Sequence, residues 1–186
     1  MVRLHWLGLA AVIGACASDD GNGVDPTLGP IPTGGTPEVV EIGRYVGLWY
    51  EIASIPMGFQ AACYNTTATY GVIDDVTVSV FNECNWDRAD GAPLSIEGTA
   101  TVTDPATNAK LLVDFGFNKA PYWIVDLGES EPGEPYPWAA VSNDTRDSLW
   151  VLARTPRIPA ARFEAIYDRL EQRDFDPARM MRTPQP

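Results

Sequence analysis

The stretch that decides the fold lies at residues 47–53 and reads Gly47-Leu48-Trp49-Tyr50-Glu51-Ile52-Ala53. From this stretch onward apolar residues recur mostly at every second position, which indicates strands rather than helices. Segments of this kind, bounded by Gly, Pro, Asp or Asn, cover 48–55, 65–72, 76–83, 94–103, 109–116, 121–127, 137–143 and 148–154. Eight short strands with regular turn signals predict an all-β sandwich or barrel.

A helix is predicted after the last strand, because Pro159 suits a first helical turn. Apolar residues then recur at helical spacing, at Phe163, Ile166, Tyr167 and Leu170. Charged residues fall on the opposite side, at Arg162, Glu164, Asp168, Arg169 and Glu171. We expect the apolar stripe to pack on the wall of the sheet, and residues 178–186 to form an extended tail.

The first 15 residues have the character of an export signal. Arg3 precedes an apolar run from Trp6 to Ala15, which is shorter than the ~20 residues that span a bilayer. The run ends in Ile13-Gly14-Ala15-Cys16, which resembles the bacterial lipobox. That resemblance implies cleavage before Cys16 and attachment of fatty acyl chains such as palmitate to this cysteine. The alternative is an ordinary secretory signal with an incidental cysteine.

The following residues, 16–43, are rich in Gly, Pro, Asp, Ser and Thr and predict a flexible linker without a core of its own. The order would be a lipid anchor, a linker and then one folded domain over 44–177. Ala17 follows the cysteine, and resemblance to sorting rules of enteric bacteria implies the outer membrane. The expected location is therefore the bacterial cell envelope.

Charge and histidine content exclude several functions. The formal net charge is -12, which disfavours binding to nucleic acid or to an anionic membrane surface. The only histidine, His5, lies in the predicted signal peptide, so the mature chain would contain none. Without histidine, the mature chain has no imidazole to act as a catalytic base or as a zinc ligand. Its three cysteines are too few for a four-thiolate metal site. We expect no enzyme, metal or cofactor.

The domain resembles the lipocalin family at several places in chain order. Residues 47–53 resemble its Gly-x-Trp signature, and Tyr122-Trp123-Ile124-Val125-Asp126 resembles the segment leading to its sixth strand. Residues 149–156 resemble the last strand with its closing arginine, while 67–70 and 96–100 fit strands two and four. The pattern is most similar to the bacterial outer-membrane lipocalins. It implies an eight-stranded up-and-down antiparallel barrel with one C-terminal α-helix on its wall.

The resemblance also gives a structural role to Gly47, Trp49 and Arg154. Trp49 would close one end of the barrel, and Arg154 would lie across its ring as a cation–π contact worth ~0.5–2 kcal/mol. A loop over 56–62 would cross the other end, with Met57 and Phe59 as a lid; the alternative is that both tuck into the rim.

The same resemblance sets which residues face inward. The expected ligand-binding lining is Thr66, Ala68, Tyr70, Val78, Val80, Asn82, Ile96, Ala100, Val102, Leu111, Val113, Phe115, Tyr122, Ile124, Ala139, Val141, Trp150 and Leu152. If the alternate residues of each strand faced inward instead, Asp114 and Asp126 would be buried without partners, which is costly. Small residues at Ala68, Gly98, Ala100 and Ala139 would leave room. The lining carries no charge, so a fatty acid or lysophospholipid suits it better than a polar metabolite.

Cys63 and Cys84 flank a hairpin whose turn lies near residues 73–75, and export to an oxidising compartment favours a disulfide. If Tyr70 pairs with Val78, Cys84 faces Tyr64, so the bond requires a bulge. Two other functions stay open at this point. A free interior thiol would suit an isomerase-like enzyme on a lipocalin barrel, and a filled barrel would suit a structural envelope protein.

Overall fold

The computed structural model describes residues 39–186, and the predicted signal peptide, Cys16 and most of the linker lie outside the described residues. A helical turn, α1 (Ile42–Tyr45), precedes β1 (Gly47–Ser54), and a 3-10 helix, η1 (Gly58–Ala62), precedes β2. The other barrel strands are β2 (Cys63–Val72), β3 (Thr77–Trp86), β4 (Pro93–Val102), β5 (Lys110–Asp114), β6 (Lys119–Leu127), β7 (Trp138–Ser142) and β8 (Leu149–Ala153). In residues 39–186 no helix is long and apolar enough to span a bilayer.

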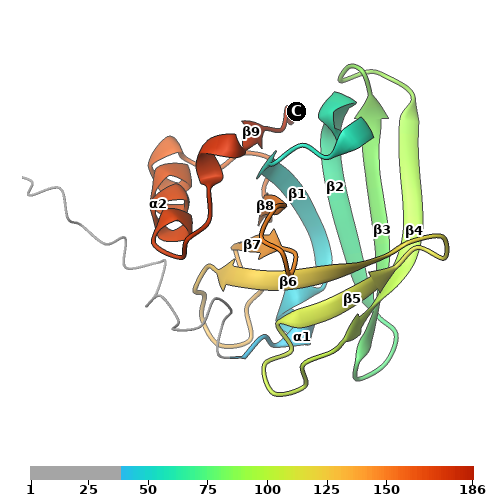
Figure 1. Ribbon diagram of the computed structural model, residues 1–186, viewed down its shortest axis with the longest axis vertical. Coiled ribbons are helices and arrows are strands. Elements are labelled where there is room, and N and C mark those ends of the chain that lie inside the picture. The colour runs from blue at the N-terminus through green and yellow to red at the C-terminus, as the bar shows by residue number, and fades with distance from the viewer. Residues whose placement is uncertain (1–38) are drawn as a thin grey trace, which may run out of the picture.

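These strands form the predicted barrel. Each pairs antiparallel with the next from β2 to β8, β8 pairs with β1, and β1 pairs back with β2 from Gly47↔Tyr70 to Tyr50↔Thr67. The eight-stranded antiparallel barrel with a C-terminal helix is therefore confirmed. Figure 1 shows α1 at one end of the barrel and η1 at the opposite end. We call these the closed end and the open end.

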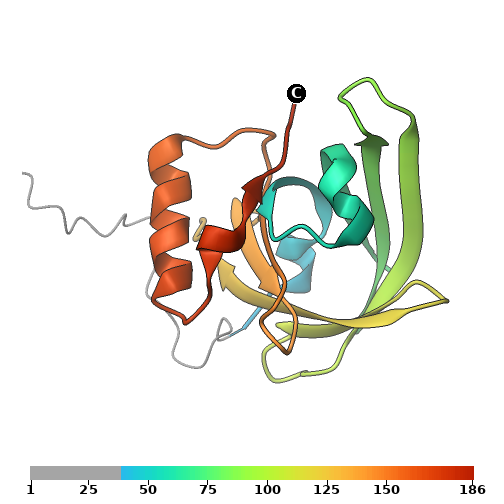
Figure 2. The same ribbon diagram turned by 45° about the horizontal axis from the view of Figure 1, so that its top comes forward.

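Two clusters of buried apolar side chains hold the fold together. The interior cluster fills the barrel and includes Trp49, Ile124 and Val141. The outer cluster lies between the wall and α2 (Ala160–Glu171), the helix beside the barrel in Figure 2. Since β7 and most of β8 have one face in each cluster, both strands are nearly continuous apolar runs.

The helix docks through an ion pair that the sequence pattern missed. Arg169, expected on the solvent side of α2, is buried and binds Asp126 of β6 through two hydrogen bonds of 2.7 and 2.6 Å. Arg173 adds a third contact to the Asp126 carboxylate at 3.2 Å and donates to Val125 O at 2.6 Å. Asp126 does face away from the barrel interior, but α2 covers it, and the helix and the turn after it supply Arg169 and Arg173 as its partners.

The C-terminal segment closes a gap in the barrel wall. After a 3-10 helix, η2 (Pro177–Arg179), the short strand β9 (Met181–Arg182) pairs with Ser54 and Ala53 of β1. Pro184 O then accepts a hydrogen bond from Asn65 N of β2. The segment thus lies between β1 and β2 beyond the point where their own pairing ends.

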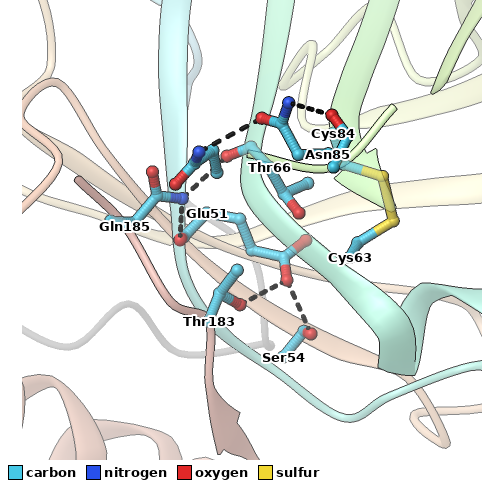
Figure 3. Close-up of a disulfide and its surroundings, with 10 residues drawn as sticks. Glu51, Ser54, Cys63, Thr66, Cys84, Asn85, Thr183 and Gln185 are labelled. Atoms are coloured by element: carbon cyan, nitrogen blue, oxygen red, sulfur yellow. Dashed lines mark hydrogen bonds between the residues drawn. A yellow bond between two sulfur atoms is a disulfide. The ribbon is translucent and has the colours of Figure 1, made fainter. Parts of the chain in front are cut away.

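Cys63 and Cys84 form the disulfide expected from the hairpin, drawn in Figure 3. The hairpin register differs from the sequence assumption, because Tyr70 pairs with Val80 instead of Val78. The expected bulge is present between Tyr64 and Thr67, where Asn65 adopts a positive φ of 54°. The bulge shifts the register of β2 and lets the two cysteines meet.

Replacing Cys63 and Cys84 together by alanine should lower the free energy of unfolding by about 3 kcal/mol, because the bond closes a loop in the unfolded chain. Urea unfolding of the oxidised protein and of the double variant measures the difference. Titration of the folded, unreduced protein should find no free thiol at these two positions. Equal unfolding midpoints would show that the bond does not stabilise this fold.

Candidate ligand-binding site

The barrel interior gathers most of the residues proposed to bind ligand. Its buried cluster contains Tyr70, Val78, Val80, Ala100, Val102, Leu111, Val113, Ile124, Ala139, Val141 and Leu152. Four further residues of the expected lining are partly buried against it, namely Ala68, Phe115, Tyr122 and Trp150. Alternation along eight paired strands brings these side chains together, and their role in binding stays a prediction.

Three residues of the expected lining lie outside the interior cluster. Thr66, Asn82 and Ile96 are half-buried toward the open end of β2, β3 and β4. Thr66 Oγ1 and Asn82 Oδ1 are buried without a hydrogen-bond partner in the described structure. The interior is therefore more polar toward the open end than in its middle.

Gly98 does not leave the room that the sequence suggested. A Cβ atom placed on Gly98 would lie 2.7 Å from the Phe115 ring and 2.5 Å from Asp114 O. The glycine is needed because β5 and its following turn approach closely at this point. Phe115 thus occupies the space that a larger residue at position 98 would take.

A pocket lies inside the barrel near the closed end. It is lined by Ile42, Tyr45, Tyr70, Val78, Ala100, Leu111, Val113 and Tyr122. Its empty volume is about 270 Å³ with the open solvent at its mouth included, and the enclosed part has room for about one water molecule. None of the lining residues is charged.

Three tyrosines, Tyr45, Tyr70 and Tyr122, form a hydroxyl network in this pocket, and we call them the tyrosine triad. The Tyr122 hydroxyl lies 2.7 Å from the Tyr45 hydroxyl and 3.0 Å from the Tyr70 hydroxyl. Tyr45 was missing from the expected lining because it precedes the first strand, on α1. The signal that could have found it is the apolar spacing of Ile42, Tyr45 and Val46 before Gly47.

Burial keeps the tyrosine triad in its neutral form. Removal from water raises the pKa of Tyr70 to about 12 and raises the pKa of Tyr45 and Tyr122 well above the ordinary tyrosine value. The nearby Glu51 carboxylate acts on Tyr70 in the same direction. The network therefore presents neutral hydroxyls, which can donate and accept hydrogen bonds, over the whole physiological pH range.

Substituting Tyr122 alone should cost more stability than substituting all three members of the tyrosine triad. Tyr122→Phe leaves the hydroxyls of Tyr45 and Tyr70 buried without their partner, which costs about 1–3 kcal/mol. The triple phenylalanine variant removes every hydroxyl of the network and leaves none unpaired, so its loss should be smaller. Urea unfolding of both variants measures which of them loses more stability. A larger loss in the triple variant would contradict the network.

The closed end is built as the Gly-x-Trp resemblance implied. Trp49 is 0% exposed, and its Nε1 donates to Tyr45 O at 2.7 Å. The Arg154 guanidinium lies 3.6 Å from the centre of the indole ring and donates to the carbonyl oxygens of residues 44, 45, 46, 48 and 136. Gly47 has a φ of 100°, a backbone conformation that other residues rarely adopt. These residues are structural and lie beneath the pocket.

The open end holds the expected lid segment. Met57 is 47% exposed and stands beside η1, and the side chain of Phe59 lies outside the described residues. The lid role of these two residues therefore stays a prediction.

Glu51 is a buried carboxylate that the sequence interpretation left without a role. Its Oε1 accepts hydrogen bonds from Ser54 Oγ at 2.8 Å and from Thr183 Oγ1 at 2.6 Å (Figure 3). Gln185 Nε2 bridges the backbone oxygens of Glu51 and Thr66. Burial raises the pKa of Glu51, although both hydroxyls oppose that shift.

Stability should fall as pH rises above the ordinary glutamate pKa of 4.5, since the folded chain holds the Glu51 proton more tightly than the unfolded chain. The tighter binding of the Glu51 proton contributes fully to the free energy of unfolding below pH 4.5. This contribution is lost as the pH rises through the raised pKa of Glu51 in the folded protein. Glu51→Gln keeps an acceptor for both hydroxyls and should remove this component. Urea midpoints of both proteins at several pH values from 4 to 8 check it. Parallel pH curves for the two proteins would exclude Glu51 as the cause.

The described residues offer no group of three or more potential metal ligands of the His, Cys, Asp or Glu type. Both cysteines in this part of the chain are bonded to each other. What the barrel interior can do chemically is surround an apolar group with an uncharged lining.

Comparison with known proteins agrees with this geometry. The lipocalin-like domain family matches residues 40–185. A putative lipocalin of Acanthamoeba polyphaga mimivirus is 30% identical over 77% of this chain and 83% of its own length. The outer membrane lipoprotein Blc of Vibrio cholerae is 30% identical over 76% of this chain and 80% of its own.

Among solved structures, insecticyanin of the tobacco hornworm Manduca sexta shares the fold with a TM-score of 0.62. It is 17% identical, and the match covers 85% of this chain and 87% of that chain. The chain belongs to the lipocalin family. This membership is consistent with binding of lipophilic ligands.

Proposed function

We propose that this chain is a membrane-anchored lipid-binding protein that stores or transports fatty acids or lysophospholipids in its barrel. The observation that carries the proposal is the interior lining, which is apolar and ends in an uncharged pocket. An acyl chain gains free energy from such a lining because it leaves water without losing hydrogen bonds. We expect binding without catalysis, since Cys63 and Cys84 are bonded and neither offers a free thiol.

Lipid extraction from the purified full-length chain, followed by mass spectrometry, tests the binding. We expect a fatty acid or lysophospholipid to copurify, or a fluorescent fatty acid to bind and be displaced by either lipid. Ala100→Leu, which fills the pocket, should weaken this binding, whereas Thr101→Leu on the exposed face of the same strand should not. A correctly folded protein that neither carries nor takes up lipid would overturn the proposal.

The anchor is proposed from Cys16, in the outer membrane of a bacterial cell envelope. The name of one relative, an outer membrane lipoprotein, supports this location, while a viral relative shows that the family is broader. Cys16→Ser should release the chain from the membrane fraction and abolish labelling by radioactive palmitate. Unchanged membrane association of the variant would rule out this anchor.

A filled barrel that binds no ligand is the second candidate, because the enclosed part of the pocket is so small. The two candidates differ in the lipid-uptake experiment. Uptake with a one-to-one stoichiometry supports the binding protein, and its absence supports the structural role.

A further inference from the structure

Four large apolar side chains are exposed around the open end of the barrel. Met57, Trp86, Leu94 and Met181 are between 40% and 62% exposed, and we call them the apolar rim. Met57 directly precedes η1, and Trp86 ends β3, where it pairs with the first residue of β2. Leu94 lies on β4 in the same hairpin as Trp86, and Met181 pairs with the last residue of β1. Figures 1 and 2 both show η1, the β3–β4 connection and the C-terminus at this end of the barrel.

The closed end of the barrel is strongly acidic. The connections between β2 and β3, β4 and β5, and β6 and β7 lie at this end and contain no basic residue. Val40, just before α1, donates to Thr107 O in one of them, and Arg44 on α1 donates to Glu134 O in another. The side chain of Arg44 also forms a salt bridge with Glu41 at 2.7 Å. The carboxylates of the three connections belong to Asp74, Asp75, Asp104, Glu129, Glu131 and Glu134.

The connections at the open end are nearly neutral by comparison. Residues 55–62 and 115–118 contain no charged side chain, and residues 87–92 and 143–148 each contain two aspartates and one arginine. Arg182 adds a positive charge next to Met181 of the apolar rim. Carboxylates therefore exceed basic side chains far more at the closed end than at the open end.

This difference between the two ends orients the barrel at a lipid surface. The negative surface potential of an anionic membrane repels the acidic closed end, whereas the open end approaches without comparable repulsion. Apolar side chains at the open end gain free energy when they leave water for the interface of the bilayer. Tryptophan is enriched at such interfaces, and Trp86 is the tryptophan of the apolar rim. Exposed apolar residues also occur at the closed end, but Ile73 and Val76 flank the carboxylates of Asp74 and Asp75.

The proposed anchor at Cys16 allows the open end to reach the membrane. Residues 17–38 separate Cys16 from the described chain, and at ~3.3–3.6 Å per residue they can span up to about 75 Å. The described chain enters the barrel at the closed end, at Val40. A strand of ten residues such as β3 is only about 33 Å long. The chain between anchor and barrel is therefore longer than the barrel itself.

We propose that the apolar rim is a docking surface for a lipid bilayer, on which the protein stands with its open end toward the membrane and its acidic closed end away from it. This inference takes the attachment at Cys16 from the proposed function and does not require a lipid inside the barrel. The rim alone binds weakly and reversibly. The anchor raises its effective concentration at the surface, so the two signals together hold the barrel there.

Fluorescence quenching by brominated lipids tests this orientation in the full-length, acylated protein. Vesicles of phosphatidylcholine with bromine on the acyl chains quench a tryptophan that enters the bilayer. We expect the vesicle-bound protein to show such quenching and the Trp86→Phe variant to lose it. Adding Ile73→Trp to the Trp86→Phe variant places a tryptophan at the closed end, and this one should not be quenched.

A pair of triple variants measures the contribution of the apolar rim. Met57→Ser/Leu94→Ser/Met181→Ser keeps Trp86 as the probe and should lower the ratio of docked to undocked barrels at least about tenfold, because three apolar side chains are lost. Val72→Ser/Ile73→Ser/Val76→Ser removes three exposed apolar side chains at the closed end and should leave the quenching unchanged. Both sets are exposed, so the comparison isolates position from hydrophobicity.

Several outcomes would overturn the docking surface. Quenching of Ile73→Trp equal to that of Trp86, or an anchored protein in which neither is quenched, would show that the open end does not face the bilayer. A dimer in analytical ultracentrifugation that the rim variant dissolves, without any quenching, would assign the rim to a second copy of this chain. Wild-type protein that does not associate with the vesicles would exclude both anchor and docking. Uptake of a fluorescent fatty acid is measured separately, so a failure of lipid binding is distinguishable from a failure of docking.

Discussion

Asp126→Ala should lower the free energy of unfolding by about 3–5 kcal/mol, because it leaves two arginines buried without their shared carboxylate. Asp126 is 1% exposed and binds Arg169 and Arg173 through three contacts of 2.6–3.2 Å. These contacts attach α2 and the turn that follows it to the barrel wall. Urea unfolding followed by circular dichroism measures the loss.

Asp114→Ala is the matched control for this substitution. Asp114 pairs with Lys119 at 2.9 Å, but Lys119 is exposed and Asp114 is partly exposed, so the pair should contribute no more than about 1 kcal/mol. Combining Asp126→Leu with Arg169→Met and Arg173→Met should recover most of the lost stability, since no buried charge then lacks a partner. A loss at Asp126 no greater than that at Asp114 would mean that α2 does not depend on this ion pair.

Trp49→Ala should cost about 3–5 kcal/mol, because it removes a fully buried aromatic side chain and leaves a cavity at the closed end. The substitution also removes the hydrogen bond to Tyr45 O and the ring under the Arg154 guanidinium. The tyrosine triad should loosen as well, since the Trp49 and Tyr45 rings are in contact at 5.2 Å between centres.

Trp86→Ala provides the comparison, because Trp86 is a tryptophan on β3 that is 40% exposed. We expect it to cost less than about 1 kcal/mol, as substitutions at exposed positions usually do. Thermal unfolding of the two variants, with ligand affinity as a second readout, separates their effects. Similar melting temperatures for both would show that Trp49 does not close the barrel as inferred.

Local patterns in the sequence predicted the parts of the fold that depend on neighbours along the chain. Alternation at every second position predicted the strands, although β3 runs three residues further than expected and β5 ends earlier. The positions of Cys63 and Cys84 predicted the disulfide, and the need for a bulge was met at Asn65. Each of these features depends on backbone geometry within one strand or hairpin, which a sequence pattern can express.

Local sequence patterns predicted only part of the candidate site. The resemblance supplied the phase of the interior, but Tyr45 lies on a helical turn ahead of the first strand and gives no strand signal. Glu51 lies in an alternating apolar stretch. Only the structure shows that Ser54 and Thr183 donate hydrogen bonds to its buried carboxylate. A period-two pattern describes which side of a strand a residue occupies, not what lies beyond that side.

By itself the sequence determined the strands and the helix that follows them, because these follow from residue spacing and hydrophobic burial. The resemblance to lipocalins added the closed barrel and the choice of inward-facing residues. Tertiary structure alone decided that Asp126 pairs with Arg169, that residues 183–185 fill the gap between β1 and β2, and that three distant tyrosines share one hydrogen-bond network. These contacts join residues 43 to 134 positions apart. Such pairs meet only when the closed barrel fixes the strands in space, since no local spacing encodes their distance.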